Sequence, residues 1–393
     1  MPRMLIDRKT RTRIASAGLV IFLILLLASF HARSLWAAQP DGTSWVFSAK
    51  PEVVDSAGRF TSIAVDDLGN VHLAYTNESD HVFYAFRDVS TGKWFHTDVD
   101  SRASFAFLSL DPEGNPSLCY TQRTIHYAHW NGREWNRQEV APGSGAVAYY
   151  CSVRVSAEGV PHVTWYQERT AEDTNYLHMR HAFLDNGQWL VKTLDWDAQT
   201  GKWHSMVLDA KGAPHVSFDA FVSGQLKYAV GEGDGATWHV VPVDSRRASQ
   251  EPGRGMGNSL ALNAQGLAMI SYFEDSALKY ARQKPDGKWS TETLAPVTPS
   301  VTWAGYRSVQ ALDSKGLPHI VYEDAGVLRH IFWTGSRWQS QLIAHAGSAR
   351  LRYGAIAIAK DDTIYISFHD PDDGSVVVMV GRPIAASETA AKQ

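Results

Sequence analysis

The sequence predicts an all-β fold in which one small antiparallel sheet is repeated around a closed ring, and three periodic features predict it. A turn glycine, replaced by aspartate in the last copy, recurs at intervals of about 45 to about 54 residues. An aromatic residue stands six positions after each of these turns. A tryptophan opens the last strand of six of the copies. A period in this range is typical of propellers and solenoids.

The repeats are in register along the chain. The turn residues are Gly69, Gly114, Gly159, Gly212, Gly266, Gly316 and Asp362. The aromatic residues that follow them are Tyr75, Tyr120, Trp165, Phe218, Tyr272, Tyr322 and Phe368. The tryptophans are Trp94, Trp135, Trp189, Trp238, Trp289 and Trp338. Seven registers with a small sheet in each predict a seven-bladed β-propeller.

The copy at 259–294 shows why each element is expected to be a strand. Residues alternate with period two in 259–262, 268–272 and 278–281, and such alternation favours strands over helices. Glycine, asparagine and Pro-Asp-Gly separate the runs and favour tight turns. The fourth strand opens at Trp289. Each blade is therefore predicted to hold four antiparallel strands.

The last copy lacks its tryptophan strand, and the N-terminal side of the chain supplies one. Residues 42–55, around Trp45, match the pattern of a fourth strand. Pairing of this strand with the last blade would close the ring and remove both open edges. We therefore predict a propeller over residues 39–382 and a disordered tail over residues 383–393.

Residues 1–38 resemble an export segment. Basic residues precede an apolar run at 14–30, and small residues end the segment at Ala37 and Ala38. This order is typical of a signal peptide. The run is near the lower limit for a membrane span, so a retained membrane anchor is the alternative. Both alternatives place the propeller outside the cytoplasm, in the periplasm, on the cell surface or secreted.

Composition and motifs exclude several function classes. The net charge is −4 and no basic block lies outside the export segment, which argues against nucleic acid as a partner. No phosphate loop, cysteine–histidine cluster or calcium loop is present, so we expect no cofactor and no metal. Four histidines follow the short turns, one per blade, and we interpret them as bonded to their own turns: His72, His162, His215 and His319. Asp370, Asp372 and Asp373 are interpreted as a solvated turn in preference to a calcium site.

Two cysteines, Cys119 and Cys151, leave two alternatives open. An oxidising compartment would permit a bridge between neighbouring blades. Two small buried thiols are the favoured interpretation, because neither residue is expected in a loop. The protein is expected to be a monomer.

The two faces of the predicted ring differ. The short-turn face carries the repeat glycines and the turns before the tryptophans. The long-loop face carries the gaps after the repeat aromatics and the links between blades, such as 195–202, 244–257 and 296–305. Because binding residues are concentrated on variable loops of a rigid scaffold, the functional site is predicted on the long-loop face.

Candidate residues on that face fall into two groups. The starts of first strands carry the ligand-binding candidates Arg59, Trp203, Tyr306, Arg307 and Arg352, together with Tyr353. The ends of second strands carry Glu323, Asp324, His369 and Asp370. Blades 6, 7 and 1 are neighbours in a closed ring, so Arg59, Arg307 and Arg352 are expected around one sector. Either the acidic groups pair with these arginines in a structural ring, or the arginines hold an anion by bidentate hydrogen bonds.

Three functions are compatible with these residues. The first is binding of a glycan, which can be acidic, with aromatic rings stacking on the sugars. The second is a polysaccharide lyase that uses Arg352, His369 and Tyr353, or a glycoside hydrolase that uses two carboxyl groups such as Glu323 and Asp324. The third is a protein-interaction scaffold, which would present a broad apolar patch.

The repeat also resembles a known type. Ser-φ-x-φ-Asp-x-x-Gly-x-Pro-His, then Leu-Lys-Tyr-Ala at 226–229 and 278–281, then Gly-x-x-Trp, is similar to bacterial propellers with BNR, or Asp-box-like, repeats of the sialidase superfamily. The resemblance covers nearly all of the chain after the export segment. That group includes sialidases, polysaccharide lyases and lectins, so the resemblance implies a fold and no single activity. Only fragments of the Asp-box remain, as at 235–238, and the Arg-Ile-Pro motif is absent, which argues against sialidase activity.

Overall fold

A computed structural model of the protein describes residues 44–141, 148–167, 178–196, 200–220, 223–233, 235–245, 257–274, 276–298, 308–324, 326–345, 352–370 and 372–384. The regular secondary structure of these residues is entirely β-strand. The strands form seven antiparallel sheets within one compact unit, Ser44–Ile384. In this part of the chain no helix is long and apolar enough to span a membrane. The predicted fold class is confirmed.

Each sheet is one blade, and its strands follow one another from the innermost to the outermost. Blade 1 contains β3 (Arg59–Val65), β4 (Val71–Thr76), β5 (Val82–Arg87) and β6 (Trp94–Asp100). Blade 2 contains β7 (Ser104–Leu110), β8 (Pro116–Gln122), β9 (Thr124–Trp130) and β10 (Trp135–Glu139). Blade 3 contains β11 (Ala148–Val155), β12 (Pro161–Gln167), β13 (His178–Asp185) and β14 (Gln188–Asp195). Blade 4 contains β15 (Thr200–Leu208), β16 (Pro214–Ala220), β17 (Gln225–Glu232) and β18 (Thr237–Ser245).

The remaining blades repeat this order. Blade 5 contains β19 (Ser259–Leu262), β20 (Ala268–Glu274), β21 (Ala277–Gln283) and β22 (Trp289–Pro296). Blade 6 contains β23 (Ser308–Leu312), β24 (Pro318–Asp324), β25 (Val327–Trp333) and β26 (Trp338–His345). Blade 7 contains β27 (Arg352–Ile358), β28 (Ile364–His369) and β29 (Val376–Ile384), with β1 (Ser44–Phe47) and β2 (Glu52–Asp55) on its outer edge.

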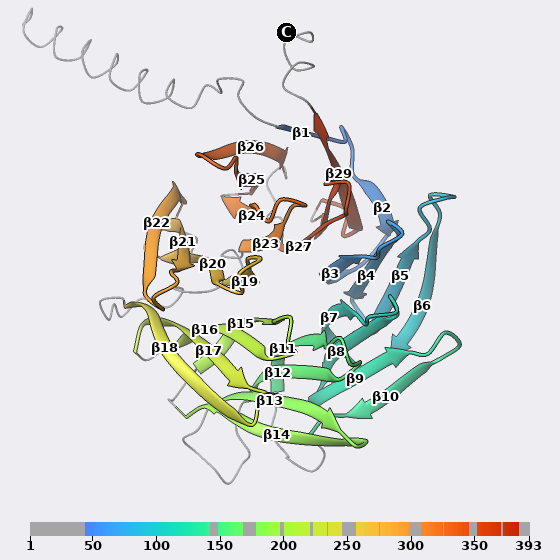
Figure 1. The fold of residues 1–393 in the computed structure, drawn as a ribbon. Coiled ribbons are helices and arrows are strands. Elements are labelled where there is room, and N and C mark those ends of the chain that lie inside the picture. Colours follow the sequence, from blue (N-terminus) through green and yellow to red (C-terminus); the bar gives the residue numbers. More distant parts are fainter. Residues whose placement is uncertain are drawn as a thin grey trace, which may run out of the picture. The chain divides into compact units, whose positions relative to one another are not determined.

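The first strands of the blades close a circle. Strand β3 contacts β7, and the contacts continue through β11, β15, β19, β23 and β27 back to β3 (Figure 1). The chain therefore returns to its start, and every sheet has a neighbour on each side.

The N-terminal strands complete blade 7, as predicted. Strand β1 pairs with β29, with Ser44 opposite Ile384 and Trp45 opposite Pro383. Strand β2 also pairs with β29, with Glu52 opposite Val378. The sequence pattern predicted one closing strand, and the structure has two short ones along the same partner strand. Both ends of the described chain are thus held by the same sheet.

The turns between first and second strands share a backbone hydrogen bond from the repeat glycine, or from Asp362 in blade 7, to the carbonyl three residues earlier. In blade 1 an oxygen of the Asp66 carboxylate accepts hydrogen bonds from the backbone N–H groups of Leu68 (2.9 Å) and Asn70 (2.8 Å). Gly69 has a φ of 87°, in the left-handed region that glycine adopts without steric cost. Asp362, which replaces the repeat glycine in blade 7, has a φ of 63°, and aspartate is one of the few other residues that tolerate this region.

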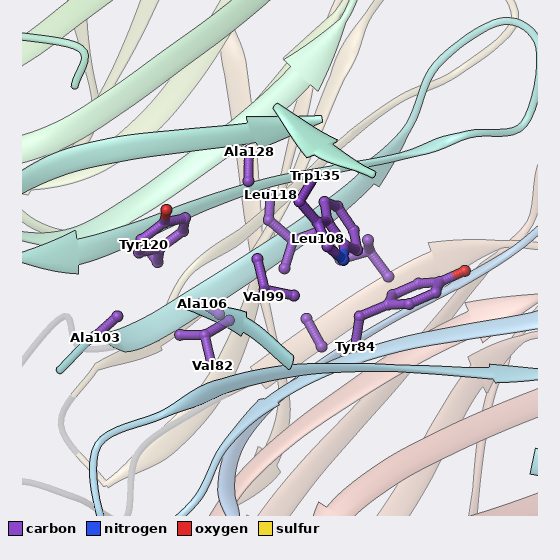
Figure 2. Packing of buried hydrophobic residues seen from close by; sticks show 11 residues of the cluster. Val82, Tyr84, Val99, Ala103, Ala106, Leu108, Leu118, Tyr120, Ala128 and Trp135 are labelled. Carbon is purple, nitrogen blue, oxygen red and sulfur yellow. The ribbon is translucent and has the colours of Figure 1, made fainter. Parts of the chain in front are cut away.

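The hydrophobic core is divided among the blade interfaces. Seven clusters of buried residues occupy the seven interfaces, one between each pair of neighbouring blades. Figure 2 shows the cluster between blades 1 and 2, where Val82, Tyr84 and Val99 meet Leu118 and Trp135. The repeat aromatics are buried in these clusters, which explains why they occur at a fixed position in each repeat.

Six of the seven fourth-strand tryptophans stack edge-on against the preceding blade, and the seventh, Trp94, donates its indole N–H to Glu52 at 3.0 Å. The partner is the aromatic or histidine ring of the third strand in that blade. The centroid distances are 5.4 Å for Trp135–Tyr84, 5.4 Å for Trp189–Tyr127, 5.1 Å for Trp238–His181, 5.2 Å for Trp289–Tyr228, 4.9 Å for Trp338–Tyr280 and 5.9 Å for Trp45–His330. Edge-to-face pairs of this kind add about 0.5–1.5 kcal/mol beyond the burial of their area.

Candidate functional site

The histidines of the short-turn face are buried, and they form hydrogen bonds within their own blades. In blade 1 Nδ1 of His72 is 2.7 Å from the Tyr84 hydroxyl, and Nε2 is 3.4 Å from the carboxylate of Asp66 in its own turn. In blade 6 Nδ1 of His319 is 2.9 Å from Nε2 of His330. These side chains are buried. They link second and third strands, so their regular spacing in the sequence reflects the architecture of the blade.

Across the described residues, no group of three or more histidine, cysteine, aspartate or glutamate side chains is placed to hold a metal ion. The Asp370 carboxylate accepts the N–H of Asp372 at 3.0 Å, and the Asp373 carboxylate accepts the N–H of Ser375 at 2.9 Å. Both carboxylates are thus occupied in shaping the turn between β28 and β29.

The predicted arginine sector is described only at Arg59. A guanidinium nitrogen of Arg59 is 3.1 Å from an Asp80 carboxylate oxygen, and the guanidinium carbon lies 5.5 Å from the centroid of the Phe60 ring. Tyr306 and Arg307 lie outside the described residues, and the side chains of Arg352 and Tyr353 lie outside them as well. The expected convergence of the three arginines therefore remains a prediction.

The carboxylate and histidine candidates lie at the ends of the predicted strands. Asp324 accepts the N–H of Thr298 at 2.8 Å and lies 3.9 Å from Nε of Arg329. Glu323 is buried at the end of β24. His369 is half-buried at the end of β28, where its backbone pairs with Arg352. Asp324 thus supports the link from the preceding blade, a structural role.

Carboxylates at the ends of outer strands hold neighbouring blades together. Asp100 accepts the Tyr120 hydroxyl of the next blade at 2.7 Å. Asp244 accepts the Tyr272 hydroxyl at 2.5 Å and an ammonium hydrogen of Lys279 at 2.8 Å. Asp55–Tyr75 (2.5 Å) and Asp195–Lys227 (2.8 Å) are the equivalent pairs at two further interfaces. This arrangement favours a structural role for many of the acidic residues on this face.

These contacts change the proton affinities of the groups that they join. Burial, and then the hydrogen bond to Asp100, raise the pKa of Tyr120. Burial alone would lower the pKa of Lys279, but its hydrogen bonds to Asp244 and Glu274 raise it. The tyrosine therefore stays neutral and the lysine stays charged near neutral pH, so both hydrogen bonds between neighbouring blades are retained.

The long-loop face carries a run of contacting aromatic rings, which we call the aromatic belt: Phe60, Phe105, Tyr150 and Trp203. The ring centroids are 4.4 Å apart for Phe60–Phe105, 5.0 Å for Phe105–Tyr150 and 4.4 Å for Tyr150–Trp203. The four residues come from β3, β7, β11 and β15, the first strands of blades 1 to 4. All four side chains are half-buried. The predicted candidate Trp203 thus belongs to a larger set.

The backbone of the belt is strained. Phe60, Phe105 and Tyr150 have φ values of 56°, 55° and 51°. A bulky side chain in this left-handed region is an outlier that costs on the order of 1–3 kcal/mol. Each of these residues lies at a register shift between the first and second strands of its blade. A bulge there directs an extra side chain toward the start of the first strand, on the long-loop face.

Sequence analysis identified Trp203 as a candidate but did not predict that it belongs to a belt, although the belt residues share one position in the repeat. Each belt residue stands nine positions before the repeat glycine of its blade, as Phe105 does before Gly114. Blade 5 has Gly257 at this position, with a φ of 79°, so the same backbone occurs there without a side chain. Only the register of the bulge identifies the belt residues as one set.

A disulfide lies directly behind the belt. Cys119 on β8 and Cys151 on β11 are bonded, with their Cα atoms 6.1 Å apart. The interpretation as two separate thiols was therefore wrong, because the second strand of blade 2 and the first strand of blade 3 approach closely enough for two small side chains to meet. Cys151 follows Tyr150 in the chain, and its sulfur lies 3.8 Å from the carbonyl oxygen of Phe105. The bond thus joins the two blades at the centre of the belt.

Comparisons with known proteins support the fold. Neither a protein-family model nor a curated protein matches the sequence. Among solved structures, the polysaccharide lyase Uly1 matches with a TM-score of 0.55 at 10% identity, over 85% of this chain and 91% of the lyase. A fungal alcohol oxidase of the AA5 family, in complex with copper, matches with a TM-score of 0.55 at 11% identity, over 87% of this chain and 77% of the oxidase.

A lectin is also similar. The Aleuria aurantia lectin AAL, in complex with Fucα1-6GlcNAc, matches with a TM-score of 0.50 at 11% identity, over 74% of this chain and 97% of the lectin. At such identities the similarity shows a shared propeller architecture. It assigns no activity, because unrelated functions occupy the same fold.

Proposed function

We propose that this protein binds a glycan on its long-loop face, through the aromatic belt. The observation that carries the proposal is the strained backbone of the belt. Glycine fits the left-handed conformation without cost, and Gly257 occupies the equivalent position in blade 5. In blades 1 to 3 the same position is occupied by Phe60, Phe105 and Tyr150, each with a large aromatic ring. Strained, bulky residues that persist against a local preference are typical of ligand-binding sites.

The chemistry of the belt suits sugars. A row of half-buried rings offers a rigid apolar surface, and the C–H faces of pyranose rings pack on such surfaces. Aromatic side chains provide large contact areas with little conformational freedom to lose. Arg59 lies beside Phe60 and is held by Asp80, so a polar group borders the surface at one end. The architecture shared with a polysaccharide lyase and a lectin supports the same class of ligand.

A glycan-array screen with the purified protein tests this proposal. The wild-type protein is expected to retain at least one class of glycan, and a Phe60→Ala/Phe105→Ala/Tyr150→Ala variant is expected to lose at least about tenfold in affinity. The matched control is Leu68→Ala, which removes an exposed apolar side chain from the short-turn face. A folded wild-type protein that binds no glycan would contradict the proposal and favour a protein-interaction scaffold.

Catalysis is the second candidate. The lyase alternative depends on Arg352, His369 and Tyr353, and the hydrolase alternative on two carboxyl groups such as Glu323 and Asp324. The side chains of Arg352 and Tyr353 lie outside the described residues. Incubation of the protein with every glycan that it retains, followed by analysis of chain length and of unsaturated ends, tests for catalysis. New chain ends that are absent from an Arg352→Ala/His369→Ala variant would establish an enzyme.

The proposal includes export of the propeller and the BNR-like type of its repeats. Export is supported by the apolar run at 14–30 and by the disulfide between Cys119 and Cys151, which requires an oxidising compartment to persist. Fusion of residues 1–43 to alkaline phosphatase, which is active only outside the cytoplasm, tests the export segment. An inactive fusion protein that accumulates in the cytoplasm would contradict it.

A further inference from the structure

A second aromatic side chain on the long-loop face lies apart from the belt. Trp196 is 73% exposed. In the described part of the chain the other exposed aromatic residue is Phe95, at 55%. Phe95 is the second residue of β6, near the short-turn end of that strand. Trp196 is therefore the strongly exposed aromatic residue on the face that carries the belt.

The ring of Trp196 is supported by its neighbours. It directly follows Asp195, the last residue of β14, which is buried and accepts a hydrogen bond from the Lys227 ammonium at 2.8 Å. The indole and the His178 ring meet edge to face, with the centroids 5.3 Å apart and the planes at 68°. The ion pair at the preceding residue and the contact with His178 favour a defined orientation of the indole, most of whose surface is open to solvent.

Trp196 lies on the same blade as the belt residue Tyr150. Tyr150 is near the start of β11 and Trp196 follows the end of β14, and in an antiparallel blade both positions lie on the long-loop face. The two strands are separated by β12 and β13, which places them about 14 Å apart across the sheet. This separation exceeds the size of one sugar unit, and a chain of several units can cover it.

We propose that Trp196 is an outer subsite for a carbohydrate chain that starts on the belt at Tyr150 and runs outward across blade 3. The inference rests on the proposed glycan binding and adds that the ligand is a polymer or a long oligosaccharide. A short ligand occupies the belt alone. A longer one also stacks on Trp196 and is retained more strongly.

Isothermal titration calorimetry with two series of probes, cello-oligosaccharides and oligogalacturonates from the disaccharide to the octasaccharide, tests the inference. For the series that binds, Trp196→Ala is expected to lower the affinity for the longest members about tenfold and to leave the shortest members unchanged. Trp196→Tyr keeps a ring and is expected to restore most of the loss. Tyr150→Ala is expected to weaken short and long members alike, and Phe95→Ala is the control for an exposed aromatic residue elsewhere.

The outcomes separate the inference from the proposed function. Equal affinities of wild type and Trp196→Ala at every chain length would overturn the inference and leave glycan binding intact. An equal loss at every length, or a lower unfolding temperature for both Trp196 variants, would show that the indole supports the fold, and would overturn it too. A wild-type protein that binds no member of either series and no glycan on the array would overturn both.

Discussion

The two faces of the ring use aromatic and histidine side chains in opposite ways. On the short-turn face, His72 and His319 are buried and each contacts a carboxylate of its own turn and a ring of the neighbouring strand. On the long-loop face, Phe60, Phe105 and Tyr150 are half-buried and held in a costly backbone conformation. The histidines, which could have served in catalysis or metal binding, therefore stabilise the fold. The aromatic residues of the belt form the candidate site.

Loss of the closing tryptophan is expected to have the largest effect on stability. Trp45 packs against His319, with the centroids 4.4 Å apart, and its indole N–H donates to the carbonyl of Asp362 at 3.1 Å. Trp45→Ala should lower the free energy of unfolding by about 3–5 kcal/mol, because it leaves a cavity and frees the strand that closes the ring. Urea unfolding measures this loss. Val46→Ala, on the exposed side of the same strand, should stay within about 0.5 kcal/mol of wild type, and equal effects of the two variants would contradict the role of Trp45.

Removal of the disulfide tests the rigidity of the long-loop face. Cys119 and Cys151 are 32 residues apart in the chain. Cys119→Ser/Cys151→Ser should lower the free energy of unfolding by about 3–4 kcal/mol, mainly because the unfolded chain gains freedom. Since the bond joins the blades of Phe105 and Tyr150, glycan affinity should fall as well. A variant with lower stability and unchanged affinity would show that the belt does not depend on the bond.

A buried histidine pair in blade 6 should make the fold sensitive to acid. Burial, and to a smaller extent the neighbouring His319, lower the pKa of His330 well below its usual value. The folded protein therefore keeps His330 neutral, whereas the unfolded chain takes up a proton below about pH 6.5, so stability falls as the pH drops through this range by up to about 1.4 kcal/mol per unit. His330→Tyr, which copies the His72–Tyr84 pair of blade 1, should remove this contribution.

Urea midpoints at a series of pH values between neutral and mildly acidic conditions measure the difference. The control is Tyr84→His, which should add acid sensitivity to blade 1 by the same reasoning. If the dependence on pH is identical in wild type and His330→Tyr, the histidine pair does not set the acid response. Glycan affinity should be insensitive to both substitutions, because His330 and Tyr84 are buried on third strands, away from the first strands that carry the belt.

The strain in the belt predicts that glycine is more stable than alanine at a belt position, the reverse of the usual order. This is the smallest of the expected effects on stability. Glycine is usually less stable than alanine in a strand by about 0.5–1 kcal/mol. At position 105 the left-handed backbone should reverse this order, so that Phe105→Gly is more stable than Phe105→Ala by about 1 kcal/mol. At Phe107, half-buried on the same strand, the usual order is expected. If the alanine variant is the more stable one at both positions, the backbone of the belt is not strained.

Much of the fold could be predicted because its determinants are local. Period-two alternation sets the strands, the repeat glycines set the turns, and Trp45 occupies the place of a fourth-strand tryptophan. The candidate site was harder to predict. The arginine sector depended on side chains such as Arg307 that lie outside the described residues, and Asp324 supports a link in the structure.

By itself, the sequence determined the number of blades, the position of the strands in each blade and the closure of the ring, since each of these follows from spacing along the chain. Tertiary structure alone decided that Cys119 bonds to Cys151 and that Phe60, Phe105, Tyr150 and Trp203 form one surface. The physical reason is that these contacts cross blade interfaces. They depend on how the inner strands of neighbouring blades lie beside one another in space, and no pattern within one repeat specifies the distance between two blades.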